Sequence, residues 1–101
     1  MEKIKFKLYI TGKTFRSEKA IETLRNICNR IGDTAEMSII DILEDPEEAE
    51  KDKILATPTL LKTYPPGTRR IVGDLYDEEK VIRGLDLKGY ISQKSKGERK
   101  Q

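Results

Sequence analysis

The chain has 101 residues, which is the length of one domain and leaves no room for a second folding unit. Charged residues make up 38% of it, yet 20 lysines and arginines nearly balance 18 aspartates and glutamates, and the net charge of +2 argues against a dedicated nucleic-acid-binding protein. It has no histidine, the ordinary catalytic base and metal ligand, and its single cysteine, Cys28, cannot form an internal disulfide.

The distribution of apolar and basic residues bears on location and partners. No run approaches the roughly 20 apolar residues of a transmembrane helix, and the first residues lack the continuous apolar stretch of a signal peptide. Residues 92–101 contain four basic residues and one acidic residue. We therefore expect a cytoplasmic protein whose partners are proteins rather than membranes or nucleic acids, with one domain over residues 1–91 and a basic, disordered tail over 92–101.

The first predicted elements are a strand and a helix. Apolar residues alternate with lysines and a tyrosine over residues 3–10, the period of a strand with one buried face and one solvated face. Apolar residues then recur at helical spacing over residues 20–31. Thr14 or Ser17 can cap this helix, and Gly32 can end it, because glycine tolerates the left-handed cap conformation.

A second strand and a second helix follow. Residues 37–42 are apolar at both parities, which favours a strand that is covered on both faces. Strand, helix and strand in this order form a βαβ unit. Asp45 followed by Pro46 is typical of a helix start, because aspartate caps the first turn and proline fits its first position. We expect the second helix to begin near Pro46.

The remaining part is predicted to hold two strands and a third helix. Pro58 lacks the N–H group needed for pairing, so a strand over residues 59–64 begins after it. The Pro-Pro-Gly turn at 65–67 leads to another strand over 69–75. Asp77 can cap a final helix whose apolar positions have helical spacing. The predicted order is βαβαββα, the thioredoxin-like α/β arrangement.

A thioredoxin-like order raises the question of redox chemistry. Such chemistry uses a thiolate near a helix N-terminus, and the residues that open the first predicted helix include no cysteine. Cys28 lies toward the other end of that helix on its apolar stripe, where we interpret it as a small buried residue. Gly12-Lys13-Thr14 is similar to the end of a phosphate-binding loop, but Lys7 stands where that motif requires its first glycine. We therefore expect no cofactor, no metal and no catalysis.

Two segments of the chain resemble the KaiB family. One runs from Asp52 to Leu61 and the other from Arg69 to Leu75, and the likeness extends over about residues 5–88. This resemblance implies a non-enzymatic, protein-binding regulator of a hexameric KaiC-type ATPase, with KaiA or a signalling kinase as further partners. The contact residues that it implies are Glu50, Lys53, Ile54, Arg69 and Arg70.

The resemblance also implies two folds for one chain. KaiB proteins are metamorphic: the part that corresponds to about residues 50–87 exchanges between a thioredoxin-like monomer, which binds KaiC, and a βαββααβ ground state that self-associates as a dimer or tetramer. We expect Gly84 and Asp86 to bias this switch. Because glycine weakens a helix by about 1 kcal/mol relative to alanine, we expect Gly84→Ala to favour the thioredoxin-like monomer.

Several alternatives stay open at this point. Pro58 occupies the place at which thioredoxin-like proteins carry a cis proline, and the resemblance raises the expectation of a cis bond there, although trans is far more common. One alternative function is a thioredoxin-like redox enzyme that uses Cys28, and another is a sensor-type domain of a signalling kinase system. The basic tail replaces the acidic tail of the cyanobacterial clock proteins, which leaves both circadian and stress-response regulation open.

Overall fold

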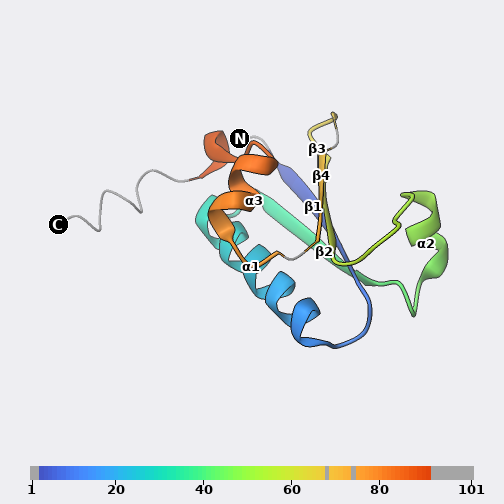
Figure 1. Cartoon of the computed structure of the whole chain (residues 1–101). Coiled ribbons are helices and arrows are strands. Elements are labelled where there is room, and N and C mark those ends of the chain that lie inside the picture. Colours follow the sequence, from blue (N-terminus) through green and yellow to red (C-terminus); the bar gives the residue numbers. More distant parts are fainter. Residues whose placement is uncertain (1–2, 68, 74, 92–101) are drawn as a thin grey trace.

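The computed structural model describes residues 3–67, 69–73 and 75–91, and the tail predicted over 92–101 lies outside the described residues. The order of elements confirms the predicted βαβαββα arrangement (Figure 1). In chain order the elements are β1 (Ile4–Ile10), α1 (Phe15–Ile31), β2 (Ala35–Asp41), α2 (Pro46–Lys51), β3 (Thr59–Tyr64), β4 (Arg69–Val72), α3 (Glu78–Gly84) and a short 3-10 helix (Lys88–Tyr90).

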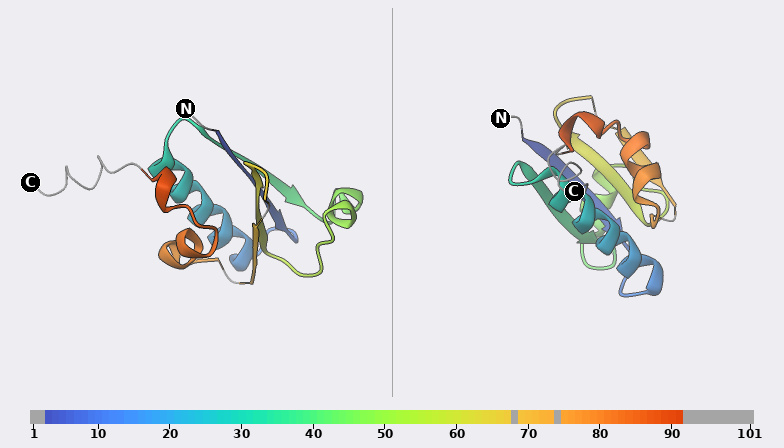
Figure 2. Two further views of the ribbon diagram at one scale, coloured as in Figure 1. Left: turned by 90° about the horizontal axis from the view of Figure 1, so that it is seen from above. Right: turned by 90° about the vertical axis from the view of Figure 1, so that its left-hand side faces the viewer.

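The four strands form one sheet in the order β2-β1-β3-β4. Strand β2 is parallel to β1, β3 is antiparallel to β1, and β4 is antiparallel to β3. Helices α1 and α3 lie together on one face of the sheet, whereas α2 lies on the other face, as two views at right angles show (Figures 1 and 2). The domain therefore has three layers, and the thin layer is α2.

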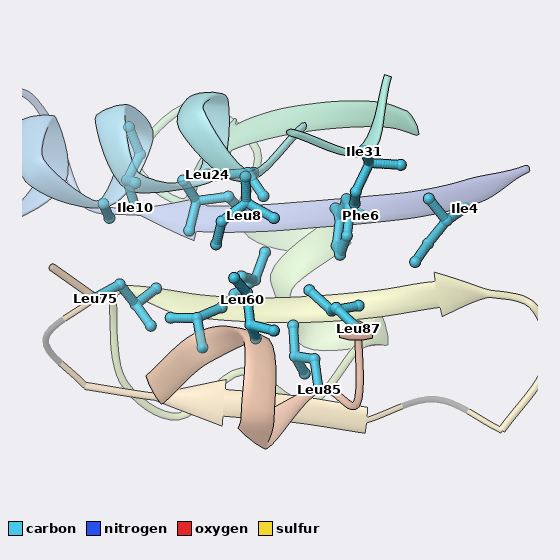
Figure 3. Packing of buried hydrophobic residues seen from close by; sticks show 14 residues of the cluster. Ile4, Phe6, Leu8, Ile10, Leu24, Ile31, Leu60, Leu75, Leu85 and Leu87 are labelled. Carbon is cyan, nitrogen blue, oxygen red and sulfur yellow. The ribbon is translucent and has the colours of Figure 1, made fainter. Parts of the chain in front are cut away.

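The main core lies between the sheet and the layer of α1 and α3 (Figure 3). The apolar face of β1 packs against α1, and Leu8 of that face lies beside Leu60 of the neighbouring strand β3 in the strand register. Burial of this face confirms the alternation predicted for the first strand. The fully buried members of the core, each below 2% exposure, include Ile4, Leu8, Leu24, Ile27, Leu60, Leu85 and Leu87.

The predicted helix ends are confirmed. The Oγ1 atom of Thr14 accepts a 3.1 Å hydrogen bond from the Ser17 N–H group, so Thr14 is the cap. Gly32 closes this helix with a φ of +106°. Helix α2 begins at Pro46 after its cap Asp45, and Asp77 caps α3 through the Lys80 N–H group.

Strand β2 differs from the prediction of a strand covered on both faces. It is an edge strand, none of its residues is buried, and Ile39 is 37% exposed. Its two parities are nevertheless apolar for a reason: Met37 packs against the main core, whereas Ile40 packs against a smaller cluster on the α2 face. Both faces of the strand are partly covered, but the central position in the sheet belongs to β1.

The other face of β1 also differs from the prediction of a solvated surface. Tyr9 is 0% exposed and Lys7 is half-buried, because α2 lies over this face. Tyr9 forms the smaller cluster with Ala49 of α2 and Leu61 of β3. The helix of only six residues thereby turns one end of the strand face into a second, small core.

The last strand is shorter than predicted. We expected it to extend over residues 69–75, but β4 ends at Val72. Gly73 follows with a φ of +113°, a conformation outside the strand region, and redirects the chain. Leu75 then enters the main core at 2% exposure instead of continuing the sheet edge.

Candidate partner-binding surface

Helix α2 is held to the sheet by a network of polar side chains. The Lys7 ammonium group donates to Glu48 at 2.7 Å and to Asp52 at 2.9 Å. The Tyr9 hydroxyl group donates to the Asp52 carboxylate and lies 3.2 Å from the main-chain oxygen of Glu48. Because these four side chains are half-buried or buried, solvent screens their interactions less than those of surface pairs.

The protonation equilibria of the network reflect these contacts. The hydrogen bond from Lys7 holds the pKa of Glu48 below its usual value, and the hydrogen bond to Glu48 raises the pKa of Lys7. Burial alone would raise the pKa of Asp52, but hydrogen bonds from Tyr9 and Lys7 outweigh it and lower the pKa. Burial and the bond to Asp52 raise the pKa of Tyr9. The network is therefore a charged lysine between two carboxylates, with a neutral phenol.

Arg70 of β4 fixes the turn that follows α2. Its Nη2 atom donates to the main-chain oxygen of Asp52 at 2.8 Å, and its Nη1 atom donates to that of Lys53 at 3.2 Å. Lys53 has a φ of +55°, in the left-handed region that residues other than glycine rarely adopt. The Ile54 N–H group then donates to the Ala49 oxygen at 2.9 Å. Side chains from two strands thus determine the path of residues 50–54.

The structure brings four of the five expected contact residues together. Glu50 and Lys53 are exposed, Ile54 is half-buried against the smaller cluster, and Arg70 reaches the same turn from β4. We call this region the α2 surface, which consists of Glu50, Lys53, Ile54 and the neighbouring Leu55. Leu55 is 97% exposed. Its exposure was missed by sequence reasoning, because a single leucine in a loop gives no periodic signal.

Arg69 does not belong to the α2 surface. Successive residues of a strand point to opposite faces of a sheet, and Arg69 shares its face with Ile71, which packs against the main core. Arg70 points to the face that carries α2. The Arg69 side chain makes no hydrogen bond or ion pair with any residue that the structure describes. The two adjacent arginines, paired as contact candidates on sequence, lie on different faces.

A pocket lies beside Pro58, and its lining residues include no cysteine. The Thr57–Pro58 peptide bond is cis, as is Tyr64–Pro65. A pocket of about 220 Å³ beside it is lined by Thr11, Thr14, Arg16, Ser17, Thr57 and Pro58. Cys28 lies elsewhere on α1, half-buried, and burial raises its pKa to about 11. A thiol with this pKa holds little thiolate at neutral pH, so Cys28 is a poor nucleophile.

The C-terminus of α3 places the two expected switch residues in well-defined surroundings. The Asp86 N–H group donates to the Arg83 oxygen at 3.2 Å, and the Leu87 N–H group donates to the Ile82 oxygen at 2.8 Å. This pattern is a Schellman motif, whose left-handed position commonly holds glycine. Here Asp86 occupies it with a φ of +56°. Because this left-handed conformation is less favourable for aspartate than for glycine, Asp86 weakens the C-terminal end of α3.

Gly84 is the last residue of α3 and faces Ile71 of β4. A Cβ atom on Gly84 would lie 2.7 Å from the Cδ1 atom of Ile71 and 3.3 Å from its Cγ1 atom. The expectation that Gly84→Ala favours the thioredoxin-like fold considered helix propensity alone, and this contact with Ile71 opposes that gain. Alanine would require the terminal methyl group of the half-buried Ile71 side chain to move, and the cost of that movement offsets part of the gain in helix propensity.

Two general features of the described residues bear on function. No helix among them combines the length and the apolar character that crossing a membrane requires. Over the same ranges, no group of three or more carboxylate or cysteine side chains is placed to hold a metal ion.

Comparison with known proteins adds a family. Residues 7–87 match the family model described as KaiB domain. The chain is 48% identical over 88 residues to circadian clock protein KaiB3 of Synechocystis sp. (strain ATCC 27184 / PCC 6803 / Kazusa), covering 86% of each chain. It is 54% identical over 82 residues to circadian clock oscillator protein KaiB of Prochlorococcus marinus (strain MIT 9312), covering 80% of this chain and 78% of that protein.

Solved structures show the same fold at low identity. The N-terminal domain of Synechococcus elongatus SasA superposes with a TM-score of 0.68 at 18% identity, with 91% of each chain covered. A thioredoxin mutant from Halobacterium salinarum NRC-1 superposes with a TM-score of 0.70 at 15% identity, covering 90% of this chain and 77% of that one. At these identities the likeness establishes a thioredoxin-like fold and nothing about activity.

Proposed function

The chain belongs to the KaiB family, and we propose that it is a non-enzymatic, cytoplasmic interaction module that binds and regulates a KaiC-type hexameric ATPase. The observation that carries this proposal is the α2 surface. Lys53, Ile54 and Leu55 present a charge and two apolar side chains on a turn fixed by Lys7, Tyr9 and Arg70. A preorganised turn loses little conformational entropy on binding, which favours a recognition site.

We further propose that the thioredoxin-like order is the binding-competent state and that the βαββααβ order is the alternative. Contacts between the two halves of the chain support a state-specific balance. Arg30 of α1 pairs with Glu78 and Glu79 of α3, each at 3.2 Å, and Asn26 donates to Glu78 at 3.0 Å. Refolding of the second half would break these contacts, so each of them stabilises the thioredoxin-like state relative to the alternative by a small amount.

An equilibrium between the two orders would control both the affinity and the rate of binding to the KaiC-type partner. If only a fraction of the chain occupies the binding-competent state, the apparent dissociation constant rises in inverse proportion to that fraction. Binding then waits for refolding, and the remaining chains are free to self-associate as dimers or tetramers. In this account circadian or stress-response regulation arises from the rate of the structural change rather than from catalysis.

A binding measurement tests the proposal. Fluorescently labelled chain is mixed with purified Synechocystis KaiC hexamer, and anisotropy is followed over hours at several temperatures. We expect slow binding with a rate that does not increase in proportion to KaiC concentration, because refolding limits it. Lys53→Ala and Ile54→Ala should weaken binding, whereas Lys19→Ala should not, because α1 lies on the sheet face opposite α2 (Figure 2). Absence of binding at micromolar concentrations of KaiC contradicts the proposal.

A sensor-type domain of a signalling kinase system is the second candidate function, and its support is a likeness of fold alone. The SasA N-terminal domain shares the fold over 91% of both chains. A signalling kinase with such a domain, or a KaiA-type protein, would then be a further partner or a competitor for KaiC. Competition is measured by adding such a domain to the preformed complex: displacement supports a shared site, and simultaneous binding contradicts it.

The redox alternative has less support. It requires Cys28 to act as a thiolate, whereas burial raises its pKa to about 11 and the pocket at Pro58 lies at the other end of α1. The alternative predicts reductase or peroxidase turnover that Cys28→Ser abolishes. We expect that Cys28→Ser leaves KaiC binding unchanged.

A further inference from the structure

Arg69 and Arg70 are both exposed and adjacent, yet their surroundings differ. Both nitrogen ends of the Arg70 fork donate to main-chain oxygens of Asp52 and Lys53, at 2.8 and 3.2 Å. The Arg69 side chain lies on the opposite face of β4 and makes no hydrogen bond or ion pair with the residues that the structure describes. The guanidinium group of Arg70 is therefore occupied within its own chain.

The turn that Arg70 holds needs such support. Lys53 is in the left-handed conformation with a φ of +55°, which is unfavourable for a residue with a Cβ atom. Oxygen atoms at the end of a helix have no partner within the helix. Arg70 satisfies the oxygen of the C-cap residue Asp52 and also that of Lys53, which follows the helix. The planar fork of arginine reaches both oxygens at once, a geometry that the single ammonium group of lysine does not reproduce.

We infer that Arg70 is a positioning residue for the KaiC-type partner: it holds the Lys53 backbone in its left-handed conformation and thereby presents Lys53 and Ile54. This inference rests on the proposed function. It assigns to Arg70 no contact with the partner and separates its role from that of Arg69, which the resemblance had placed in the same set.

The test uses two substitutions that conserve charge at adjacent positions. Arg70→Lys removes the two-oxygen geometry, and Arg69→Lys is the matched control. Binding to the Synechocystis KaiC hexamer is measured by anisotropy. We expect about tenfold weaker binding for Arg70→Lys, in the range of a lost hydrogen bond to a charged group, and a change of less than about twofold for Arg69→Lys.

A second readout needs no partner. Hydrogen exchange of the Lys53 and Ile54 amides in the free chain reports whether the turn is held, since these groups donate to Glu50 at 3.0 Å and to Ala49 at 2.9 Å. We expect exchange at these two amides to be about tenfold faster in Arg70→Lys and unchanged in Arg69→Lys.

A rescue separates local positioning from loss of overall stability. Glycine adopts the left-handed conformation without strain, so Lys53→Gly should make the turn less dependent on Arg70. We expect Arg70→Lys to weaken binding by less in the Lys53→Gly background than in the wild-type background. A purely global effect would give the same loss in both backgrounds.

The outcomes are distinct. Wild-type binding and wild-type amide exchange in Arg70→Lys overturn the inference, and so does weaker binding without faster exchange, which indicates direct contact with KaiC. If the wild-type chain does not bind KaiC, the proposed function fails. In that case unchanged exchange at Lys53 and Ile54 still overturns the structural role of Arg70, and faster exchange supports that role alone.

Discussion

The Cδ1 atom of Ile71 lies 2.7 Å from the place that a Cβ atom would take on Gly84. This contact joins α3 to β4 and sets the effect of adding a methyl group. We expect Gly84→Ala to change the stability of the thioredoxin-like monomer by less than about 1 kcal/mol, because movement of the Ile71 side-chain end offsets the gain in helix propensity. Urea unfolding at concentrations where the chain is monomeric measures the change.

The control for this prediction removes the obstructing atom. In an Ile71→Val background the Cδ1 atom is absent, and Gly84→Ala should then be neutral or stabilising. Stabilisation by the full helix propensity of about 1 kcal/mol for Gly84→Ala in the wild-type background would show that Ile71 does not oppose the substitution.

Two residues after Gly84, Asp86 is a position where a substitution should stabilise the thioredoxin-like monomer. Its φ of +56° places an aspartate where the Schellman motif suits glycine. We expect Asp86→Gly to stabilise the thioredoxin-like monomer by roughly 0.5–1 kcal/mol through relief of this conformation, less the entropy that glycine loses. The matched control is Asp33→Gly, the same substitution at an exposed turn residue without a positive φ. Equal shifts in unfolding midpoint for the two variants would contradict the explanation.

The Lys7 network predicts a pH dependence in the acid range. The folded-state pKa values of Glu48 and Asp52 lie below their unfolded values, near 4.5 and 3.8. Such groups contribute stability that is fully present above the unfolded pKa and is lost as pH falls through the folded pKa. We therefore expect stability to decline below about pH 4.5.

Asp52→Asn isolates one carboxylate of the network. At pH 7 we expect a loss of about 1 kcal/mol, a modest value because the side chain is partly exposed. The difference between wild type and variant should shrink at pH 3, where the wild-type carboxyl group is increasingly protonated. A difference that is constant from pH 3 to pH 7, measured by urea unfolding, would show that charge does not account for the contact.

Arg30 links the two halves of the chain through Glu78 and Glu79. We expect Arg30→Ala to destabilise the thioredoxin-like state by up to about 1 kcal/mol, because these are half-exposed ion pairs. Arg25→Ala is the control, since Arg25 is an exposed arginine on the same helix. If NMR peak intensities give both variants the same population of the thioredoxin-like state, the link to α3 has no energetic role.

Local chemistry made much of the fold predictable. Thr14, Gly32 and the Asp45-Pro46 pair mark helix ends through interactions within a few residues, and the alternation in β1 identifies the face that meets α1. The order of the strands in the sheet, by contrast, depends on contacts between distant parts of the chain and could not be predicted from local chemistry. Residues 37–42 have the composition of a buried strand, yet β2 lies at the edge, because only the pairing of β1 with β3 decides which strand is central.

The candidate site was predictable only where the resemblance supplied residues. Glu50 lies in the last turn of α2, and Lys53 and Ile54 follow directly after the helix. Lys7 and Tyr9, by contrast, looked solvated, since nothing in the alternation of β1 shows that α2 covers that face. The separate roles of Arg69 and Arg70 and the contact of Gly84 with Ile71 likewise depend on residues that meet only after folding.

The central claim is that the thioredoxin-like order is the form that binds KaiC. Backbone chemical shifts of isotope-labelled chain, recorded free and bound to the Synechocystis KaiC hexamer, test it most directly. The account predicts that the bound chain has strands over residues 59–64 and 69–72 and a helix over 78–84, whatever order dominates when the chain is free. A bound chain with another order of elements over residues 59–84 would contradict it.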